Sequence, residues 1–174
     1  MNKKDQIIEV VPYNSNWVSD FEAESSLIKP LFAGNFIEIH HIGSTAVPGL
    51  FAKPTIDIIL VVNDINLVDK CNDAMMRLGY EAWGENGILG RRLFLKGVEK
   101  RTHHVHAFQI GNPEIYRHIC FRDYLIAHPE AAKNYAELKI RLAKEFSKNR
   151  MAYVENKHDY IKLLEQKSLK WCNK

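Results

Sequence analysis

The segment HHIGSTAVPGLFAKPTIDIILVV, residues 40–62, places a single aspartate at the start of an otherwise apolar run. Residues 55–62, TIDIILVV, are β-branched and apolar on both faces, which is the pattern of a central strand covered on two sides. Residues 43–54 hold two glycines and two prolines and predict a loop. Because burying an unpaired carboxylate is costly, we expect Asp57 to have a partner or to open onto a site.

Strand and helix patterns alternate over the first 110 residues. The first expected elements are a short strand at 7–13 ended by Pro12, a helix from Asn14 or Ser15 to Gly34, and the alternating strand FIEIHHI at 36–42. After the central strand we expect a helix that carries Val68, Cys71, Met75 and Leu78. A short strand near Tyr80 and two strands within 91–110, joined by a turn at 97–100, should follow. From residue 112 the pattern is helical: Pro113 starts one helix, Pro129 starts a second after a break at His128, and a third covers 151–168. This order predicts an α/β (α+β) fold with a C-terminal helical extension.

The length and charge set broad limits. At 174 residues the chain suits one domain, 1–174, in which 1–110 form the α/β core and 111–174 form helices packed on it. Lys and Arg (24) exceed Asp and Glu (21) by three, and the pI is about 8.7, so an anionic ligand is weakly favoured. A nucleic acid is the less favoured partner because it needs a heavier basic footprint.

The cysteines and the N-terminus bear on the compartment. Cys71, Cys120 and Cys172 are odd in number, far apart and without CxxC spacing, so we expect neither a disulfide framework nor a zinc cluster. The N-terminus lacks the apolar stretch of a signal peptide, and no window approaches the ~20 apolar residues of a membrane span. We therefore expect a cytoplasmic protein without a membrane partner.

Gly43, Ser44 and Asp57 form the first candidate site. A Gly-Ser pair after a strand can offer N–H groups and a hydroxyl to a phosphate, although a tight turn alone also explains the pair. If the strands before and after the loop are neighbours, the Ser44 hydroxyl and the Asp57 carboxylate meet at one end of the sheet, where a carboxylate suits Mg²⁺. In the alternative, Asp57 pairs with Lys53 or an arginine only to hold the loop.

Histidines supply the second candidate group. On a strand, His104 and His106 of RTHHVHAFQ (101–109) share one face, and His103 lies on the other. Two such imidazoles can be metal ligands, proton-transfer groups or phosphate donors, or they can fill polar positions of a half-exposed strand. We expect His103 to be a bystander.

Basic residues cluster in sequence around the same strand ends. Arg92 and Lys96 are four apart, hence on one strand face, and together with Lys53 they could neutralise a triphosphate. A solvated hairpin edge blunted by charge is the competing interpretation. Solvated helix surface is favoured for most of a further polar set, His118, Arg122 and Asp123.

Four segments together resemble the GrpB family, within the nucleotidyltransferase superfamily that shares the polymerase β palm. They are HIGSTAVPGL-AKP-ID at 41–57, GENGILGRRLF-K at 84–96, RTHHVHAF at 101–108 and RHICFRDYLIAHPE at 117–130. The resemblance implies a small mixed sheet flanked by helices, with the superfamily's Gly-Ser at Gly43 and Ser44 and its first metal-binding carboxylate at Asp57. Ile59 replaces the second carboxylate, and His104 or His106 stands where a later acid is expected. Less negative charge suits a single divalent metal, Mg²⁺ or a softer ion such as Mn²⁺.

The leading hypothesis is a nucleotidyltransferase that moves a nucleotidyl or phosphoryl group from a nucleoside triphosphate to an unknown acceptor. Its catalytic and metal-binding residues would be Asp57, His104 and His106, and its nucleotide-binding residues would be Gly43, Ser44, Lys53, Arg92 and Lys96. One alternative is a catalytically depleted module that binds a nucleotide as a sensor, which Ile59 favours. Another is a His-assisted metal phosphohydrolase.

Overall fold

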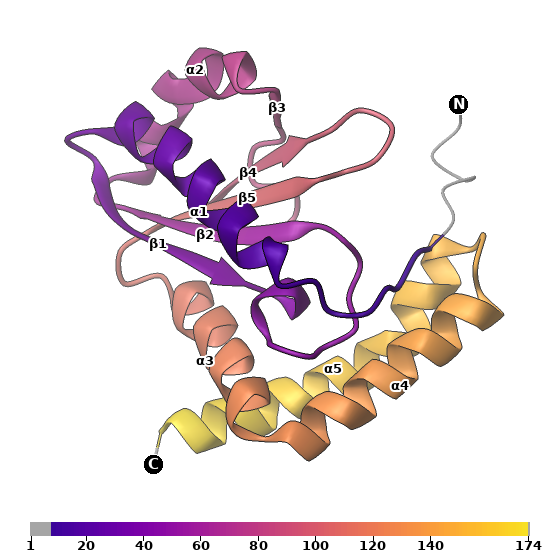
Figure 1. The fold of residues 1–174 in the computed structure, drawn as a ribbon. Helices are drawn as coiled ribbons and strands as arrows, with labels where there is room; N and C mark the ends of the chain where they lie inside the picture. The colour runs from indigo at the N-terminus through magenta and orange to yellow at the C-terminus, as the bar shows by residue number, and fades with distance from the viewer. Residues whose placement is uncertain (1–7, 174) are drawn as a thin grey trace.

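A computed structural model describes residues 8–173 of the chain (Figure 1). The strand expected at 7–13 begins outside these residues. Within them, Val11 forms an isolated bridge with Ala52, through backbone hydrogen bonds of 2.9 and 3.0 Å. This bridge ties the N-terminal segment to the loop at 43–54.

A five-stranded mixed sheet forms the centre of the structure. Its strands are β1 (Phe36–Ile42), β2 (Ile56–Val62), β3 (Tyr80–Ala82), β4 (Arg91–Lys96) and β5 (His103–Gln109), in the spatial order β1-β2-β5-β4-β3. β2 and β5 pair in parallel, and the other neighbours pair antiparallel. Both faces of β2 are buried, as its apolar sequence predicts. The sheet and its helices confirm the expected α+β class.

Helices cover both faces of the sheet (Figure 1). On one face, the first helix and the segment between β2 and β3 pack on Ile58, Leu60 and Val62 of β2. These covering elements are α1 (Asn16–Ile28), the 3₁₀ helices η1 (Lys29–Phe32) and η3 (Ile65–Cys71), and α2 (Asn72–Arg77). On the other face, Ile59 and Val61 contact Ile115 of the next helix, α3 (Pro113–Ala127). Asp57 shares the alternation of Ile59 and therefore belongs to the face under α3.

Three helices end the chain, and the starts of the first two follow the predicted signals. Asn112 accepts a hydrogen bond of 2.9 Å from a backbone N–H in the first turn of α3. Pro113 opens α3 and Pro129 opens α4 (Pro129–Glu145), whereas α5 (Arg150–Cys172) runs past the expected end at 168. α4 and α5 lie side by side (Figure 1). No helix within residues 8–173 is long and apolar enough to cross a membrane.

An apolar cluster holds these helices against the loop that follows β1. Its buried members are Val47, Leu50, Leu125, Tyr135, Ala136 and Leu164. The loop and the three C-terminal helices therefore form one packed wall beside the sheet.

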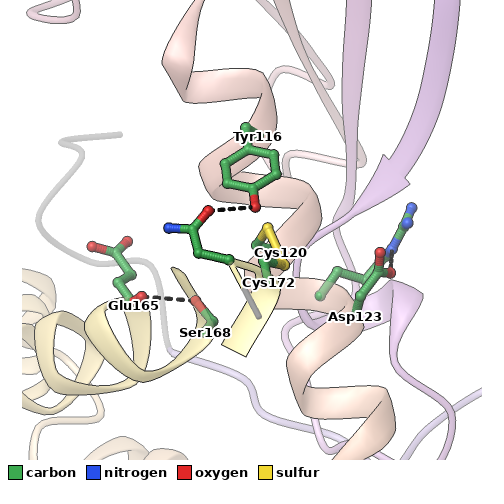
Figure 2. The surroundings of a disulfide bond; sticks show 8 residues. Tyr116, Cys120, Asp123, Glu165, Ser168 and Cys172 are labelled. Atoms are coloured by element: carbon green, nitrogen blue, oxygen red, sulfur yellow. Dashed lines mark hydrogen bonds and ion pairs between the residues drawn. A yellow bond between two sulfur atoms is a disulfide. The ribbon is translucent and has the colours of Figure 1, made fainter. Parts of the chain in front are cut away.

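A disulfide joins Cys120 of α3 to Cys172 at the end of α5 (Figure 2). The two Cα atoms are 6.1 Å apart across a sequence separation of 52 residues. The expectation that no disulfide forms is therefore wrong. Cysteine spacing carried no information about two helices that meet only through tertiary packing. Beside the disulfide, the Tyr116 hydroxyl donates a hydrogen bond of 3.0 Å to the Asn173 side chain, which also ties the end of α5 to α3.

Candidate functional site

The loop after β1 passes directly over the Asp57 carboxylate. β1 and β2 are antiparallel neighbours with Ile42 opposite Asp57, so the residues that leave β1 meet the start of β2. Gly43 has a φ of +70°, and a Cβ atom there would lie 2.6 Å from Asp57 Oδ2. Only glycine permits this approach. Ser44 follows at once, in the 3₁₀ helix η2 (Ser44–Ala46).

Asp57 and two histidines form a compact group under this loop. In the parallel pairing of β2 with β5, Asp57 lies beside His104, and Ile59 lies beside His106. Asp57 Oδ1 is 3.0 Å from His104 Nδ1 and 4.0 Å from His106 Nε2. The side chains of Asp57, His104 and His106 are 32, 27 and 16% exposed, so a solute can reach the group. His103 lies on the opposite face, as expected, 4.0 Å from Glu24.

The surroundings set the charge of this group. Burial raises the pKa of Asp57, but the hydrogen bond from His104 and the nearby imidazoles outweigh it and hold that pKa below its ordinary value. Burial lowers the pKa of His106 to about 4, against the opposing effect of the Asp57 charge. Near neutral pH the group therefore combines a carboxylate with a neutral imidazole, the forms that bind metals.

The geometry of these three side chains fits one divalent cation. One ligand atom from each of Asp57, His104 and His106 lies within 4.8 Å of the other two. A site with one carboxylate oxygen and two imidazole nitrogens suits transition metals such as Mn²⁺ better than it suits Mg²⁺, which prefers oxygen ligands. The residues present therefore accommodate the metal that the sequence predicts.

The glycine-rich segment GENGILG at 84–90 is tied to this group by Arg91. The Arg91 side chain is buried and donates hydrogen bonds to the carbonyl oxygens of Glu85 (3.1 Å) and Asn86 (2.8 Å). Its Nη1 atom also lies 3.4 Å from His106 Nδ1. Arg91 therefore holds the segment behind His106.

A cavity of about 270 Å³ opens above the carboxylate. Its walls come from the loop after β1, the starts of β2 and β5, and all three C-terminal helices. The lining residues are Gly43, Ser44, Thr45, Lys53, Thr55, Asp57, His104, Arg117, His118, Phe121, Tyr135, Lys139, Tyr153, Lys157, Ile161 and Glu165. The cavity thus gathers five of the residues selected from the sequence, Gly43, Ser44, Lys53, Asp57 and His104, with His106 next to them.

Three lysines make this cavity suited to an anion. Lys139 is 3% exposed, and its Nζ atom donates to Ser44 Oγ (2.9 Å) and to the Phe51 carbonyl oxygen, which are both neutral. Burial lowers the pKa of Lys139 to about 7, and burial together with the Lys53 charge lowers that of Lys157 to about 8. Within residues 8–173 no carboxylate forms a salt bridge with any of the three, so a bound anion would be their counter-charge.

The other charged wall residues are already paired. Arg117 of α3 forms ion pairs with Glu165 of α5 and, at 2.6 Å, with Glu114. His118 follows on the same helix, and its ring centroid is 5.9 Å from that of His106. Solvated helix surface was predicted for most of the set His118, Arg122 and Asp123, and His118 is the member that does not fit, because α3 turns it toward the sheet.

Sequence reasoning missed Lys139 and Lys157, although each had a signal. Lys139 falls four residues after Tyr135 and three before Leu142, on the buried stripe of α4. Lys157 falls four residues before Ile161, which lines the cavity with it. A lysine at an apolar stripe position is rare enough to mark a candidate site.

Arg92 and Lys96 lie on the other face of the sheet. Arg92 is opposite Ala107 and Lys96 is opposite His103, so both point away from the face that carries Asp57. Arg92 donates two hydrogen bonds to Asp69, of 2.8 and 3.0 Å. Lys96 donates to both oxygens of Glu24, at 2.8 and 2.9 Å. The two residues share a strand face as expected, but the structure does not bring them to the cavity.

The sequence matches the family model described as GrpB protein over residues 7–167. The protein YqkA of Bacillus subtilis is 45% identical over 164 residues, which cover 94% of this chain and 48% of YqkA. The chain thus spans about half the length of that relative. The crystal structure of the conserved protein GrpB from Enterococcus faecalis superposes with a TM-score of 0.93 at 41% identity, covering 95% of this chain and 100% of that chain.

A more distant likeness concerns the fold. A crystal structure of the Cid1 poly(U) polymerase with Mg 3′-dATP bound superposes with a TM-score of 0.52 at 11% identity. It covers 84% of this chain and 49% of the Cid1 chain. The sheet and its helices therefore have a nucleotidyltransferase-like arrangement.

Proposed function

Because this chain belongs to the GrpB family and has a nucleotidyltransferase-like fold, we propose that it transfers a nucleotidyl or phosphoryl group from a nucleoside triphosphate to an acceptor. One observation carries the proposal: Asp57 and His104 share a single cavity with Ser44 and three lysines, Lys53, Lys139 and Lys157, and His106 lies beside them. A chance surface cluster would not combine a metal-ligand set with buried lysines that lack counter-charges.

In this proposal the C-terminal helices bind the phosphates. Lys139 and Lys157 approach the cavity from α4 and α5, and Lys53 approaches from the loop after β1. Lys139 also fixes the Ser44 hydroxyl by the hydrogen bond of 2.9 Å. Ser44 is thereby oriented toward a phosphate oxygen, and the three ammonium groups neutralise the triphosphate. These lysines take the role that the sequence alone assigned to Arg92 and Lys96.

Asp57, His104 and His106 would hold the divalent metal, Mg²⁺ or Mn²⁺. When bound, the metal supplies charge neutralisation and alignment at the reacting phosphate. The magnesium nucleotide in the Cid1 structure is consistent with such a role here. Ile59 replaces the second carboxylate of the superfamily, and His106 lies beside Ile59 in the sheet. The His106 imidazole would therefore take the place of that carboxylate as a metal ligand.

The transfer itself is a substitution at phosphorus. An acceptor hydroxyl oxygen forms a bond to the α phosphorus, and the bond from that phosphorus to the bridging oxygen breaks, so pyrophosphate leaves with the electron pair. If only one of the two imidazoles holds the metal together with Asp57, the other takes up the hydroxyl proton. Holding both reactants in one cavity supplies much of the rate enhancement.

Calorimetric titration with a nucleoside triphosphate, with and without Mn²⁺, tests this function together with an assay of pyrophosphate release. We expect binding that the metal strengthens, and turnover with a suitable acceptor. Asp57→Asn should abolish the metal dependence and the turnover while the fold is kept, whereas the matched change Asp69→Asn, on the other face of the sheet, should alter neither.

Other outcomes would select a rival function. Metal-independent binding without turnover would identify a nucleotide sensor. A transition metal retained on purification, together with hydrolysis of simple phosphate esters, would identify a phosphohydrolase. Wild-type turnover by Asp57→Asn would remove this carboxylate from the mechanism.

A further inference from the structure

A second cavity, of about 310 Å³, lies against the first. Both cavities are lined by Lys53, Thr55 and His104, so these three side chains form their common boundary. The far walls come from three separate segments: the N-terminal stretch at 8–9, the β4–β5 turn at 99–101, and Arg150 at the start of α5. The second cavity therefore adjoins the first across this boundary, and only Arg150 among its lining residues comes from a C-terminal helix.

Positive charge dominates this second cavity. Its four cations, Lys53, Lys100, Arg101 and Arg150, face two carboxylates, Glu9 and Glu99. Lys100 pairs with Glu9 at 2.5 Å, and Arg101 donates to Glu81 at 2.9 Å and to the Gly97 carbonyl oxygen at 2.6 Å.

Lys53 and Arg150 are the cations of this cavity without an ion pair in the described residues, and Lys100 is paired only at the exposed surface, with Glu9. Desolvation is the main cause that lowers the pKa of Lys53, and the charge of Arg150 lowers this pKa further. The two cations therefore repel each other across the cavity. An anion between them would relieve this repulsion.

We propose that the second cavity binds the acceptor, and that the acceptor carries a phosphate group held by Lys100 and Arg150, with Lys53 on the boundary between this phosphate and the triphosphate. This inference rests on the proposed function, because it assigns the triphosphate to the first cavity. A phosphorylated alcohol bound in this way brings its hydroxyl to the boundary at Thr55 and His104, with Asp57 next to it. The pyrophosphate then departs on the far side, toward Lys139 and Lys157. Donor and acceptor then meet at the boundary that the two cavities share, which holds both reactants together for the substitution.

Amide-detected NMR titration separates the two cavities. Pyrophosphate is the probe for the first cavity, and glycerol 3-phosphate, added while pyrophosphate is saturating, is the probe for the second. We expect glycerol 3-phosphate to shift the amide signals at 99–101 and 150, and uncharged glycerol to leave them unchanged. The double variant Lys100→Gln/Arg150→Gln should weaken glycerol 3-phosphate by about tenfold or more, since two charge-assisted contacts are lost. Its affinity for pyrophosphate should stay within twofold of the wild type.

A matched control removes two other surface charges, Lys70→Gln/Lys144→Gln. Both lysines are exposed and lie outside the two cavities. Equal weakening of glycerol 3-phosphate in this control would show only a long-range charge effect and would overturn the proposal. The proposal is also overturned if glycerol 3-phosphate leaves the signals at 99–101 and 150 unchanged, or if its affinity survives Lys100→Gln/Arg150→Gln.

A non-hydrolysable triphosphate analogue tests the remaining alternative. If Lys100→Gln/Arg150→Gln weakens the analogue as much as it weakens glycerol 3-phosphate, the second cavity holds part of the donor, and the acceptor assignment is wrong. If neither pyrophosphate nor the analogue binds the wild type, the proposed function fails. Glycerol 3-phosphate then still reports on the second cavity by itself, so the two failures are distinguishable.

Discussion

Opening the Cys120–Cys172 disulfide should destabilise the fold, because it releases the end of α5 from α3 (Figure 2). The cleanest perturbation is Cys172→Ser. Cys172 lies at the half-buried end of its helix, whereas Cys120 is 1% exposed and its replacement would also disturb packing. A thiol reductant applied to the wild type should give the same result by a two-electron reduction to two thiols.

The magnitude follows from the loop that the disulfide closes. Residues 120 and 172 are 52 apart in sequence, and closing a loop of that length removes enough unfolded-state entropy to stabilise the fold by about 4 kcal/mol. With an unfolding entropy of ~2.1 cal/mol/K per residue, this loss should lower the Tm of a 174-residue chain by about 11 °C.

Thermal unfolding with and without reductant measures this effect in three proteins. The wild type should lose about 11 °C when reduced. Cys172→Ser should melt at the reduced wild-type temperature in both conditions. Cys71→Ser replaces the free cysteine and should respond to the reductant as the wild type does. Three reactive thiols in the unreduced, unfolded wild type, with a Tm indifferent to reductant, would refute the reasoning.

Three further perturbations test the site. Burial lowers the pKa of Lys139 from 10.5 to about 7. Between these pH values the native state therefore binds fewer protons at Lys139 than the unfolded state does. This difference should raise the free energy of unfolding by ~2 kcal/mol from pH 7 to pH 9. Lys139→Met should lose this contribution, and identical pH dependence in denaturant titrations of the two proteins would contradict it. Gly43→Ala places a Cβ atom against Asp57 at a φ of +70°. This change should lower the free energy of unfolding by about 1–3 kcal/mol and weaken Mn²⁺ binding. Unchanged Mn²⁺ affinity by calorimetry would disprove the close approach. Arg92→Gln breaks a pair with Asp69 on the other face and should leave triphosphate affinity within twofold, with a stability change below about 1 kcal/mol; a large loss of affinity would return Arg92 to the site.

Local patterns predicted much of the fold. The two-residue period of a strand was enough to put His104 and His106 on one face and His103 on the other. The apolar run of β2 identified the central strand, and the prolines at 113 and 129 located two helix starts. Each of these features depends on neighbouring residues in the chain, so the sequence was sufficient.

Features that depend on the pairing of segments distant in the chain could not be predicted from local sequence patterns. Arg92 and Lys96 share a face by strand geometry, but the pairing of β4 with β5 decides which face, and it places Lys96 opposite His103. The Cys120–Cys172 contact depends in the same way on how α5 returns along α3.

The wall of the first cavity that carries Lys139 and Lys157 was missed for a related reason. Lys139 and Ser44 are 95 residues apart and meet only because α4 packs on the loop after β1. The stripe position of Lys139 marked it as unusual, yet no local rule connects it to a serine in that loop. A candidate site of this kind can be located from one strand end, but its second wall requires the tertiary structure.

The most direct test of the central claim is a crystal structure of the protein with Mn²⁺ and a non-hydrolysable nucleoside triphosphate, with the metal located by its anomalous scattering. We expect one Mn²⁺ peak bound by Asp57 and at least one of His104 and His106, with triphosphate oxygens contacting Ser44 and Lys139. A metal bound elsewhere, or a triphosphate seated away from this cavity, would contradict the account.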